Sequence, residues 1–280
     1  TNQSLGRTMS DRITSCPIQT DEACLSLIQE QYGLHGLSCM AAPPSIESRA
    51  YLIKTENQIY VMKVMNRSQE TRVHHLLALQ EWCASFLTVI PPIIRTRSHE
   101  LFARTSTIIA VVMPFSNGEE CQQTDKEAWS LGKTVAKLHH VLAQYPDLKT
   151  LSPFLWRWPY RPTWCSTNAV CQLIHGDLTK GNIVFANHCV TAIFDFGQAH
   201  TGDPRDDLAT VIHRTLRPSL QHVFLEAYGW TTRECWSQHA QDLLLQKIVY
   251  LSTEHWGESW ASDEVLKFRS LLERVQNEGL

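Results

Sequence analysis

The chain has 280 residues, of which 43% are apolar and 19% charged, so it can bury a sizeable core as one large domain or as two lobes. Its formal net charge of −3 argues against a nucleic-acid binder, because such proteins usually carry a basic excess. The nine cysteines include no CxxC pair, and no apolar run approaches the roughly 20 residues that span a bilayer. We therefore expect a cytoplasmic protein with reduced thiols and no membrane partner.

The first part of the chain is dominated by strand patterns. A helical pattern over residues 20–33 comes first, with Thr20 at its start. Residues 48–65 then form two alternating runs around a turn at Glu56-Asn57, which predicts a β-hairpin. Lys63 lies inside the apolar end of the second run. A strand lysine usually faces solvent, but a metal–phosphate motif follows later in the chain, so we interpret Lys63 as a phosphate ligand.

The helix predicted over residues 68–86 carries an acid that can pair with this lysine. Ser68 is its expected N-cap. Glu70 follows Lys63 by seven residues and is the expected ion-pair partner, with Glu81 as the reserve. Alternatively, Glu70 is simply a first-turn acid that the helix dipole favours.

Two further strands are predicted at residues 93–97 and 107–113. The second, TIIAVVM, is almost continuously apolar, as in a buried central strand, and Pro114 ends it. A strand that stops at Met113-Pro114-Phe115 can leave main-chain groups for the edge of an adenine ring.

Helical patterns dominate beyond residue 115. A long helix should start near Asp125 with one apolar face, formed by Trp129, Leu131, Val135, Leu138 and Val141. Three more helices are expected at 220–228, 232–251 and 262–275. The Trp- and Pro-rich segment 151–166 is either a packed connector or an aromatic wall beside an acceptor site. The composition thus predicts an α+β chain with a strand-rich lobe, residues 1–115, and a helical lobe, residues 116–280.

The most informative pattern lies between residues 171 and 209. Asp177 and Asn182 are five residues apart, and Asp195 follows after a strand–turn–strand pattern over 182–194. Such a hairpin brings the three polar side chains to one end of two paired strands. Oxygen ligands of this kind suit Mg²⁺ that holds a polyphosphate, and phosphoryl transfer requires a base, metal ligands and cationic support.

Several motifs in this order resemble the aminoglycoside phosphotransferase/choline kinase-like superfamily. They are VMKV, MPF, LGKTVAKLHHV, HGDLTKGNIVF, AIFDFGQA and GDPRDDLA, and together they extend over most of the chain. The resemblance implies a protein-kinase-like bilobal fold, with a small N-terminal β-sheet lobe that includes a helix and a larger, mainly helical C-terminal lobe. It also implies ATP (with GTP possible) and Mg²⁺ as cofactors and a small-molecule hydroxyl acceptor.

The resemblance also implies roles for residues of the catalytic motif. Asp177 is implied as the catalytic base, and Asn182 and Asp195 as the metal ligands. Asp207 is implied as the acid that braces the catalytic loop, and His175 as a further support of that loop.

On the nucleotide side, the resemblance implies that Lys63 contacts the α- and β-phosphates, with Glu70 as its uncertain partner, and that Met113 to Phe115 form the adenine hinge. The turn that covers the nucleotide in the family corresponds to AAPPSIES and contains no glycine, so Ser45 and Ser48 are the expected donors there.

The acceptor stays open at the level of sequence. The lysine found two residues after the catalytic Asp in many protein kinases is replaced by Thr179, which favours a small acceptor over a protein. Antibiotics (with a role in resistance), amino alcohols such as homoserine, hydroxylysine and choline, and sugars all fit. The N-terminal segments resemble the homoserine and hydroxylysine kinase branch more faintly. The alternatives are an atypical protein kinase, a nucleotide-binding regulator without turnover, and a metal hydrolase that uses His175 and Asp177.

Overall fold

The computed structural model describes residues 20–42, 48–151 and 172–230, together with single helical positions at 266, 269, 270, 273 and 277. The expectations for Ser45, for the Trp-rich segment beyond Leu151 and for the helix over 232–251 therefore lie outside the described residues. No helix in the described ranges is long and apolar enough to cross a membrane.

By their contacts, the described residues form two units. The first contains residues 20–42, 48–81 and 91–115, and the second contains 82–90, 116–151 and 172–230.

The first unit is built on a five-stranded antiparallel sheet in the order β1-β2-β3-β5-β4. Its strands are β1 (Gly36–Ala41), β2 (Arg49–Thr55), β3 (Ile59–Asn66), β4 (Ala103–Arg104) and β5 (Ile108–Pro114). The predicted hairpin is confirmed as β2 and β3, and the predicted central strand is confirmed as β5. The edge strands β1 and β4 were not predicted.

The strand predicted over 93–97 is wrong, since only Ile94 forms a β-bridge, with Val112. The chain turns back directly afterwards. Thr96 accepts the N–H of Glu100 on its hydroxyl (3.0 Å), and His99 has a positive φ of 65°. Residues 93–97 therefore lead into a local turn that the side chain of Thr96 closes, and they do not form a continuous ladder of hydrogen bonds with a neighbouring strand.

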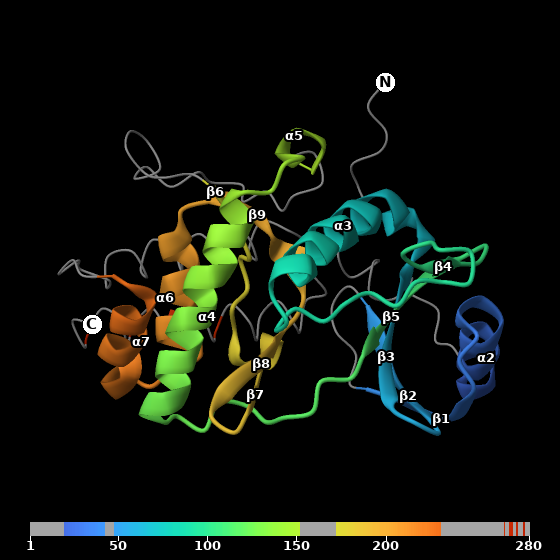
Figure 1. Ribbon diagram of the computed structural model, residues 1–280, viewed down its shortest axis with the longest axis horizontal. Helices are drawn as coiled ribbons and strands as arrows, with labels where there is room; N and C mark the ends of the chain where they lie inside the picture. The colour runs from blue at the N-terminus through green and yellow to red at the C-terminus, as the bar shows by residue number, and fades with distance from the viewer. Residues whose placement is uncertain are drawn as a thin grey trace. The chain divides into compact units, whose positions relative to one another are not determined.

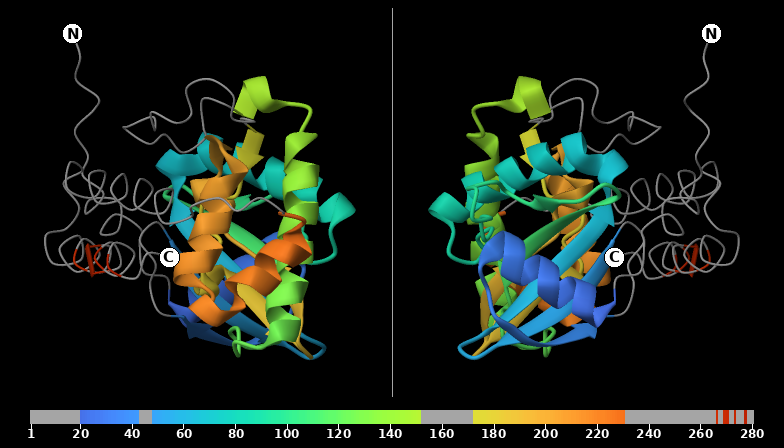
Figure 2. Two further views of the ribbon diagram at one scale, coloured as in Figure 1. Left: turned by 90° about the vertical axis from the view of Figure 1, so that its left-hand side faces the viewer. Right: turned by 90° about the vertical axis from the view of Figure 1, so that its right-hand side faces the viewer.

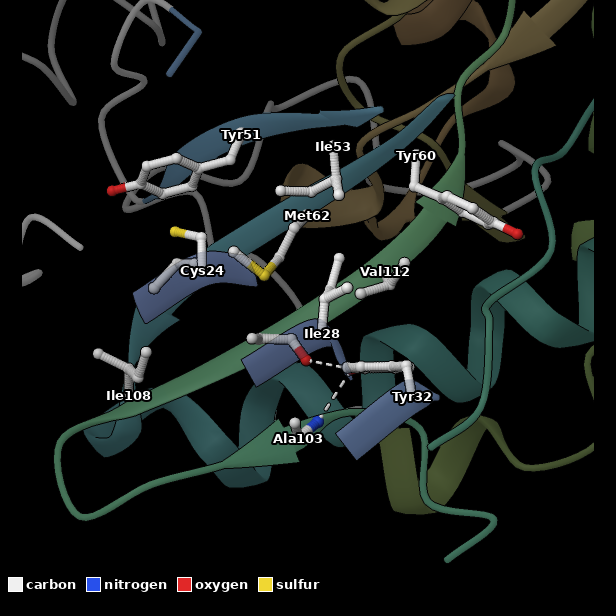
Figure 3. Close-up of a cluster of buried hydrophobic side chains, with 12 residues drawn as sticks. Cys24, Ile28, Tyr32, Tyr51, Ile53, Tyr60, Met62, Ala103, Ile108 and Val112 are labelled. Carbon is white, nitrogen blue, oxygen red and sulfur yellow. Dashed lines mark hydrogen bonds between the residues drawn. The ribbon is translucent and has the colours of Figure 1, made fainter. Parts of the chain in front are cut away.

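Strand β5 is apolar throughout because both faces of the sheet are covered. Ile108, Ala110 and Val112 pack with residues of α2 (Asp21–Leu27) and of the π-helical turn Ile28–Tyr32 that continues it (Figure 3). The alternate residues of β5 lie in a second cluster with Val73 and Leu77 of α3.

Helix α3 (Glu70–Phe86) follows a short 3-10 turn, Arg67–Gln69. The predicted cap at Ser68 is wrong, because the side chain of Asn66 caps this turn and accepts the N–H of Ser68 (2.8 Å). The predicted cap at Thr20 is confirmed, since its hydroxyl accepts the N–H of Ala23 (3.2 Å).

The second unit contains the long helix α4 (Asp125–Ala143), which a capping box of Thr124 and Glu127 starts. It packs against α7 (Gln221–Tyr228), beside which it lies in two perpendicular views (Figure 1, Figure 2). The helices approach closely at Gly132, where a Cβ atom would come within 2.4 Å of a main-chain oxygen of α7.

Four of the five predicted core positions of α4 are buried, but Trp129 is 43% exposed, so its assignment to the core is wrong. The buried face is set by the contact with α7 and extends through Ala128, Leu131, Gly132 and Val135. Trp129 lies beside this face, and the ammonium group of Lys133 stands 5.3 Å from the centre of its ring.

The remaining elements of the second unit are α5 (Leu148–Leu151), the antiparallel pair β6 (Gln172–Ile174) and β9 (His200–Gly202), the hairpin β7 (Ile183–Ala186) and β8 (Cys189–Ile193), and α6 (Pro204–Arg214). The predicted hairpin is thus confirmed. Asn187 and His188 form its turn with φ values of 50° and 62°, which is the geometry of a type I′ hairpin turn.

Candidate active site

A buried carboxylate anchors the loop that follows β6. Asp207, in the first turn of α6, is 0% exposed. Its Oδ1 accepts the N–H of Gly176 (2.8 Å), and its Oδ2 accepts the N–H of His175 (2.8 Å). The Nε2 atom of His139 on α4 lies 3.0 Å from Oδ2. Three groups from two other segments thus converge on one carboxylate, as expected for a brace.

The pKa of Asp207 is lowered from its ordinary value by these contacts. Burial alone would raise the pKa, because it disfavours the charged form, but the hydrogen bond and charge of His139 and the N–H of His175 outweigh it. The carboxylate is therefore ionised at neutral pH.

Gly176 allows the loop to pass close to its neighbours. It has a φ of 80°, and a Cβ atom at this position would lie 2.2 Å from the main-chain oxygen of Gln198. Any other side chain would push these two segments apart, which explains the glycine in the His-Gly-Asp motif.

His175 links the two segments that carry the candidate catalytic acids. Its Nε2 donates to the main-chain oxygen of Phe194 (2.9 Å), and its Nδ1 accepts the N–H of Asp177 (3.3 Å), so the proton of the ring belongs on Nε2. The imidazole is fully buried and packs on Phe196. These contacts join the loop to the segment that carries Asp195.

Asp177 and Asn182 are held together by a direct side-chain contact. The amide Nδ2 of Asn182 donates to Oδ2 of Asp177 (2.8 Å) and also to its main-chain oxygen (2.9 Å). Because Nδ2 is directed at Asp177, the amide oxygen of Asn182 is the atom that can ligate a metal ion. The side chain of Asp177 is 19% exposed and hence accessible to a small molecule.

The β7–β8 hairpin brings Asp195 to the same end as Asn182. Ile183 pairs with Ile193, and the N–H of Phe194 donates to the main-chain oxygen of Asn182 (3.0 Å). Asp195 follows at once, with a left-handed φ of 66° and its Oδ1 accepting the N–H of Gly197 (3.2 Å). A carboxylate and an amide oxygen fit Mg²⁺, which commonly takes one or two protein oxygens and completes its shell with water and phosphate.

The first unit holds the residues predicted to bind the nucleotide. Lys63, on β3, pairs with Val111, so its side chain is on the sheet face that α3 covers. Glu70, in the first turn of α3, lies 3.3 Å from Arg67 and 3.4 Å from Arg104. The reserve partner, Glu81, lies 2.7 Å from Arg95. Whether Lys63 pairs with Glu70 stays a prediction.

The predicted hinge continues the sheet beyond β5. The N–H of Phe115 donates to the main-chain oxygen of Ile59 (2.9 Å), so it is engaged in the sheet, whereas the ring of Phe115 is 38% exposed. The Sδ atom of Met113 accepts a hydrogen bond from the amide of Gln80 (3.3 Å). Ser48 is buried directly before β2. Adenine binding by Met113 and Phe115 and phosphate binding by Ser48 stay predictions.

Several residues of the site were not predicted. The ring of His139 connects Asp207 with the hydroxyl of Tyr228 (2.9 Å). Arg214 lies 3.9 Å from Asp177. The spacing of seven residues between Asp207 and Arg214, which puts both on one face of a helix, was the available signal.

The comparison with family models gives a match to the region of the candidate site. A family model described as the phosphotransferase enzyme family matches residues 168–239, which include Asp177, Asn182, Asp195 and Asp207. None of the curated proteins matches the sequence of the chain.

Solved structures match almost the whole chain. Spectinomycin phosphotransferase in complex with ADP and spectinomycin is 16% identical with a TM-score of 0.73, and the match covers 94% of this chain and 100% of that chain. An amicoumacin kinase in complex with AMP-PNP and Ca²⁺ is 12% identical with a TM-score of 0.71, and the match covers 93% of this chain and 94% of that chain. A macrolide 2'-phosphotransferase from Brachybacterium faecium is 18% identical with a TM-score of 0.62, and the match covers 91% of this chain and 96% of that chain.

At these identities the solved structures establish the fold and not the function. The α+β class predicted from sequence is confirmed. The chain thus has the fold of these solved phosphotransferases, and its residues 168–239 match the model of the phosphotransferase enzyme family.

Proposed function

We propose that this protein is a small-molecule kinase that transfers the γ-phosphate of ATP to a hydroxyl group of a small acceptor. The observation that carries the proposal is the contact of Asp177 with Asn182 at the end of the hairpin that also presents Asp195. A base beside two metal ligands is the arrangement that phosphoryl transfer requires.

In this reaction Asp177 orients the acceptor hydroxyl and receives its proton late, because the transition state is loose and needs little base strength. Asn182 and Asp195 would hold Mg²⁺, which neutralises charge on the phosphates of the nucleotide. Lys63 would contact the α- and β-phosphates. Most of the rate enhancement then comes from positioning and from preorganised charge.

The solved neighbours support a nucleotide cofactor without fixing the base, because they include complexes with ADP, AMP-PNP and GDP. We propose ATP, with GTP as the alternative. We also propose lobes at residues 1–115 and 116–280 and a cytoplasmic location, where free thiols such as those of the described cysteines persist.

The acceptor class is proposed as a hydroxylated antibiotic, an amino alcohol or a sugar. We propose antibiotics as the first acceptors to test, with a contribution to resistance, because three solved neighbours are named for spectinomycin, amicoumacin and macrolides. A coupled assay of ADP release should be run over aminoglycosides, other hydroxylated antibiotics, homoserine, hydroxylysine, choline and hexoses. Turnover with proteins but with no small alcohol would contradict the proposal.

The Asp177→Asn variant tests the assigned base. We expect kcat to fall by roughly 10²–10⁴-fold, because the variant retains an oxygen near Asn182 but cannot accept the proton. Nucleotide affinity, measured by isothermal titration calorimetry, should change little. Asp147→Asn, at an exposed acid after α4, is the control and should keep the wild-type rate. Unchanged turnover of Asp177→Asn would refute the role of Asp177.

A further inference from the structure

Arg214 brings a positive charge to the candidate base. It is in the last turn of α6, and its Nη1 lies 3.9 Å from Oδ1 of Asp177. The two side chains are 31% and 19% exposed, so the pair is only partly screened by water. At this distance the contact is an ion pair without a hydrogen bond.

The fold fixes Arg214 in this position through the same helix that braces the loop. Asp207 and Arg214 are seven residues apart, which is about two helical turns, so they lie on one face of α6. At one end of that face Asp207 holds the N–H groups of His175 and Gly176. Just beyond the other end, the hydroxyl of Thr215 donates to the main-chain oxygen of Leu178 (3.0 Å).

Asp177 therefore lies between Gly176 and Leu178, which are both held by hydrogen bonds. The residues that hold them are at the start of α6 and directly after its end, and Arg214 lies in the last turn of the same helix. A side chain mounted on such a support is positioned more sharply than one on a surface loop. The positions of the main chain at Asp177 and at Arg214 are consequently set by the fold of the second unit.

The lysine of the loop itself, Lys180, pairs with an acid other than Asp177. Thr179 carries no charge, and the ammonium group of Lys180 lies 3.4 Å from Glu120, where both side chains are more than 60% exposed. The positive charge near Asp177 is thus that of Arg214, whereas the charge of Lys180 lies at the surface.

The two oxygens of the Asp177 carboxylate have different surroundings. Oδ2 accepts the amide N–H of Asn182, while Oδ1 faces the guanidinium of Arg214 at a longer distance. The carboxylate is thereby oriented from both sides, and Oδ1 keeps its lone pairs for a further donor such as an acceptor hydroxyl.

We propose that Arg214 is a positioning residue for Asp177, which holds the carboxylate so that Oδ1 is presented to the hydroxyl group of the acceptor. The proposal rests on the kinase function proposed above. It assigns to Arg214 an effect on turnover and not on the binding of either substrate.

The test uses the full chain with ATP, Mg²⁺ and the acceptor that the wild type phosphorylates fastest. Arg214→Ala and Arg214→Gln should lower kcat roughly 10- to 100-fold, because a misplaced reacting group costs about that much. The KM for ATP and for the acceptor should stay within about twofold. Arg214→Lys should recover part of kcat, and millimolar guanidinium chloride should raise kcat of Arg214→Ala and leave the wild type unchanged.

Arg217→Ala is the matched control. Arg217 lies three residues further on and is exposed, and its substitution removes the same charge from the protein. The hydrogen bonds described for Arg217 are made by its main chain, whose N–H donates to Gln123 and whose oxygen accepts the N–H of Leu220. This variant should keep the wild-type kcat and gain nothing from guanidinium.

The possible outcomes separate the two proposals. If the wild type releases no ADP with any acceptor, the kinase function itself fails, and the role of Arg214 fails with it. If the wild type is active and Arg214→Gln keeps its kcat, only the positioning role is refuted. A raised KM for the acceptor at unchanged kcat would likewise refute positioning, because Arg214 would then bind the acceptor. If Arg214→Ala does not fold, the comparison of Arg214→Lys with Arg214→Gln decides.

Discussion

Asp207 shows how a single buried side chain can define the shape of a catalytic loop. Its two oxygens accept hydrogen bonds from the N–H groups of His175 and Gly176 and contact the ring of His139. Because these N–H groups are buried, removal of the carboxylate would leave them without an acceptor, and water could not take its place. The carboxylate thus fixes the main chain directly before Asp177.

The Asp207→Asn variant should be less stable by roughly 3 kcal/mol, because an amide can accept on one atom only and its NH₂ group faces buried donors. Urea denaturation at neutral pH measures the loss. Asp125→Asn, at an exposed acid in the first turn of α4, is the control, and its free energy of unfolding should change by about 0.5 kcal/mol or less.

The same variant should change the response of stability to acid. The pKa of Asp207 is lower in the native state than the value of about 3.9 expected in the unfolded chain. The stabilisation from ionised Asp207 is therefore complete above that value and is lost as the pH falls through the lowered native pKa. Below about pH 4 the free energy of unfolding should thus fall less steeply in Asp207→Asn than in the wild type. Parallel curves would contradict the assigned pKa shift.

At the scale of elements, the hydroxyl of Tyr32 joins two strands of the first unit. Ala103 of β4 and Ala110 of β5 are register partners, but the hydroxyl is inserted between them. It accepts the N–H of Ala103 (3.0 Å) and donates to the main-chain oxygen of Ala110 (2.5 Å) (Figure 3). Burial raises the pKa of Tyr32 to about 12, so the hydroxyl stays protonated and able to donate.

Tyr32→Phe should lower the free energy of unfolding by about 1–3 kcal/mol, because a buried N–H and a buried main-chain oxygen lose their partner together. Tyr60→Phe is the matched control. The hydroxyl of Tyr60 accepts from the side chain of Gln58, which is exposed and can turn to water, so the loss should be smaller. Both values follow from urea denaturation. A Tyr32→Phe variant as stable as Tyr60→Phe would show that the bridge between β4 and β5 is dispensable.

For the molecule as a whole, the proposed metal ligands predict that Mg²⁺ and nucleotide stabilise the fold together. ADP with Mg²⁺ at about 100 times its Kd contributes about 2.7 kcal/mol, which corresponds to a rise of roughly 5 °C in Tm. EDTA should reverse most of this rise. In Asp195→Ala, ADP should raise Tm equally with Mg²⁺ and with EDTA. Glu226→Ala, at an exposed acid of α7, should behave as the wild type does. A Mg²⁺-dependent rise that persists in Asp195→Ala would refute its role as a ligand.

The periodicity of the sequence was enough to predict those elements whose structure is decided by residues close to them in the chain. The β2–β3 and β7–β8 hairpins and helix α4 were predicted because alternation, turn residues and caps act within a few residues. The prediction for 93–97 failed because an apolar alternation there competes with the turn that Thr96 closes. Trp129 was misassigned because the pattern of a helix does not state how wide its buried face is, and the contact with α7 decides that.

The sequence by itself determined which residues form the candidate site. Asp177, Asn182 and Asp195 lie within nineteen residues on a single hairpin, so their types and spacing were enough to predict a common site. Only the tertiary structure decided which side chains hold that site. His139 contacts Asp207 across 68 positions of the chain, and Arg214 reaches Asp177 from another helix. The seven-residue spacing of Asp207 and Arg214 puts both on one face of a helix, but which segment that face contacts depends on how the helices pack.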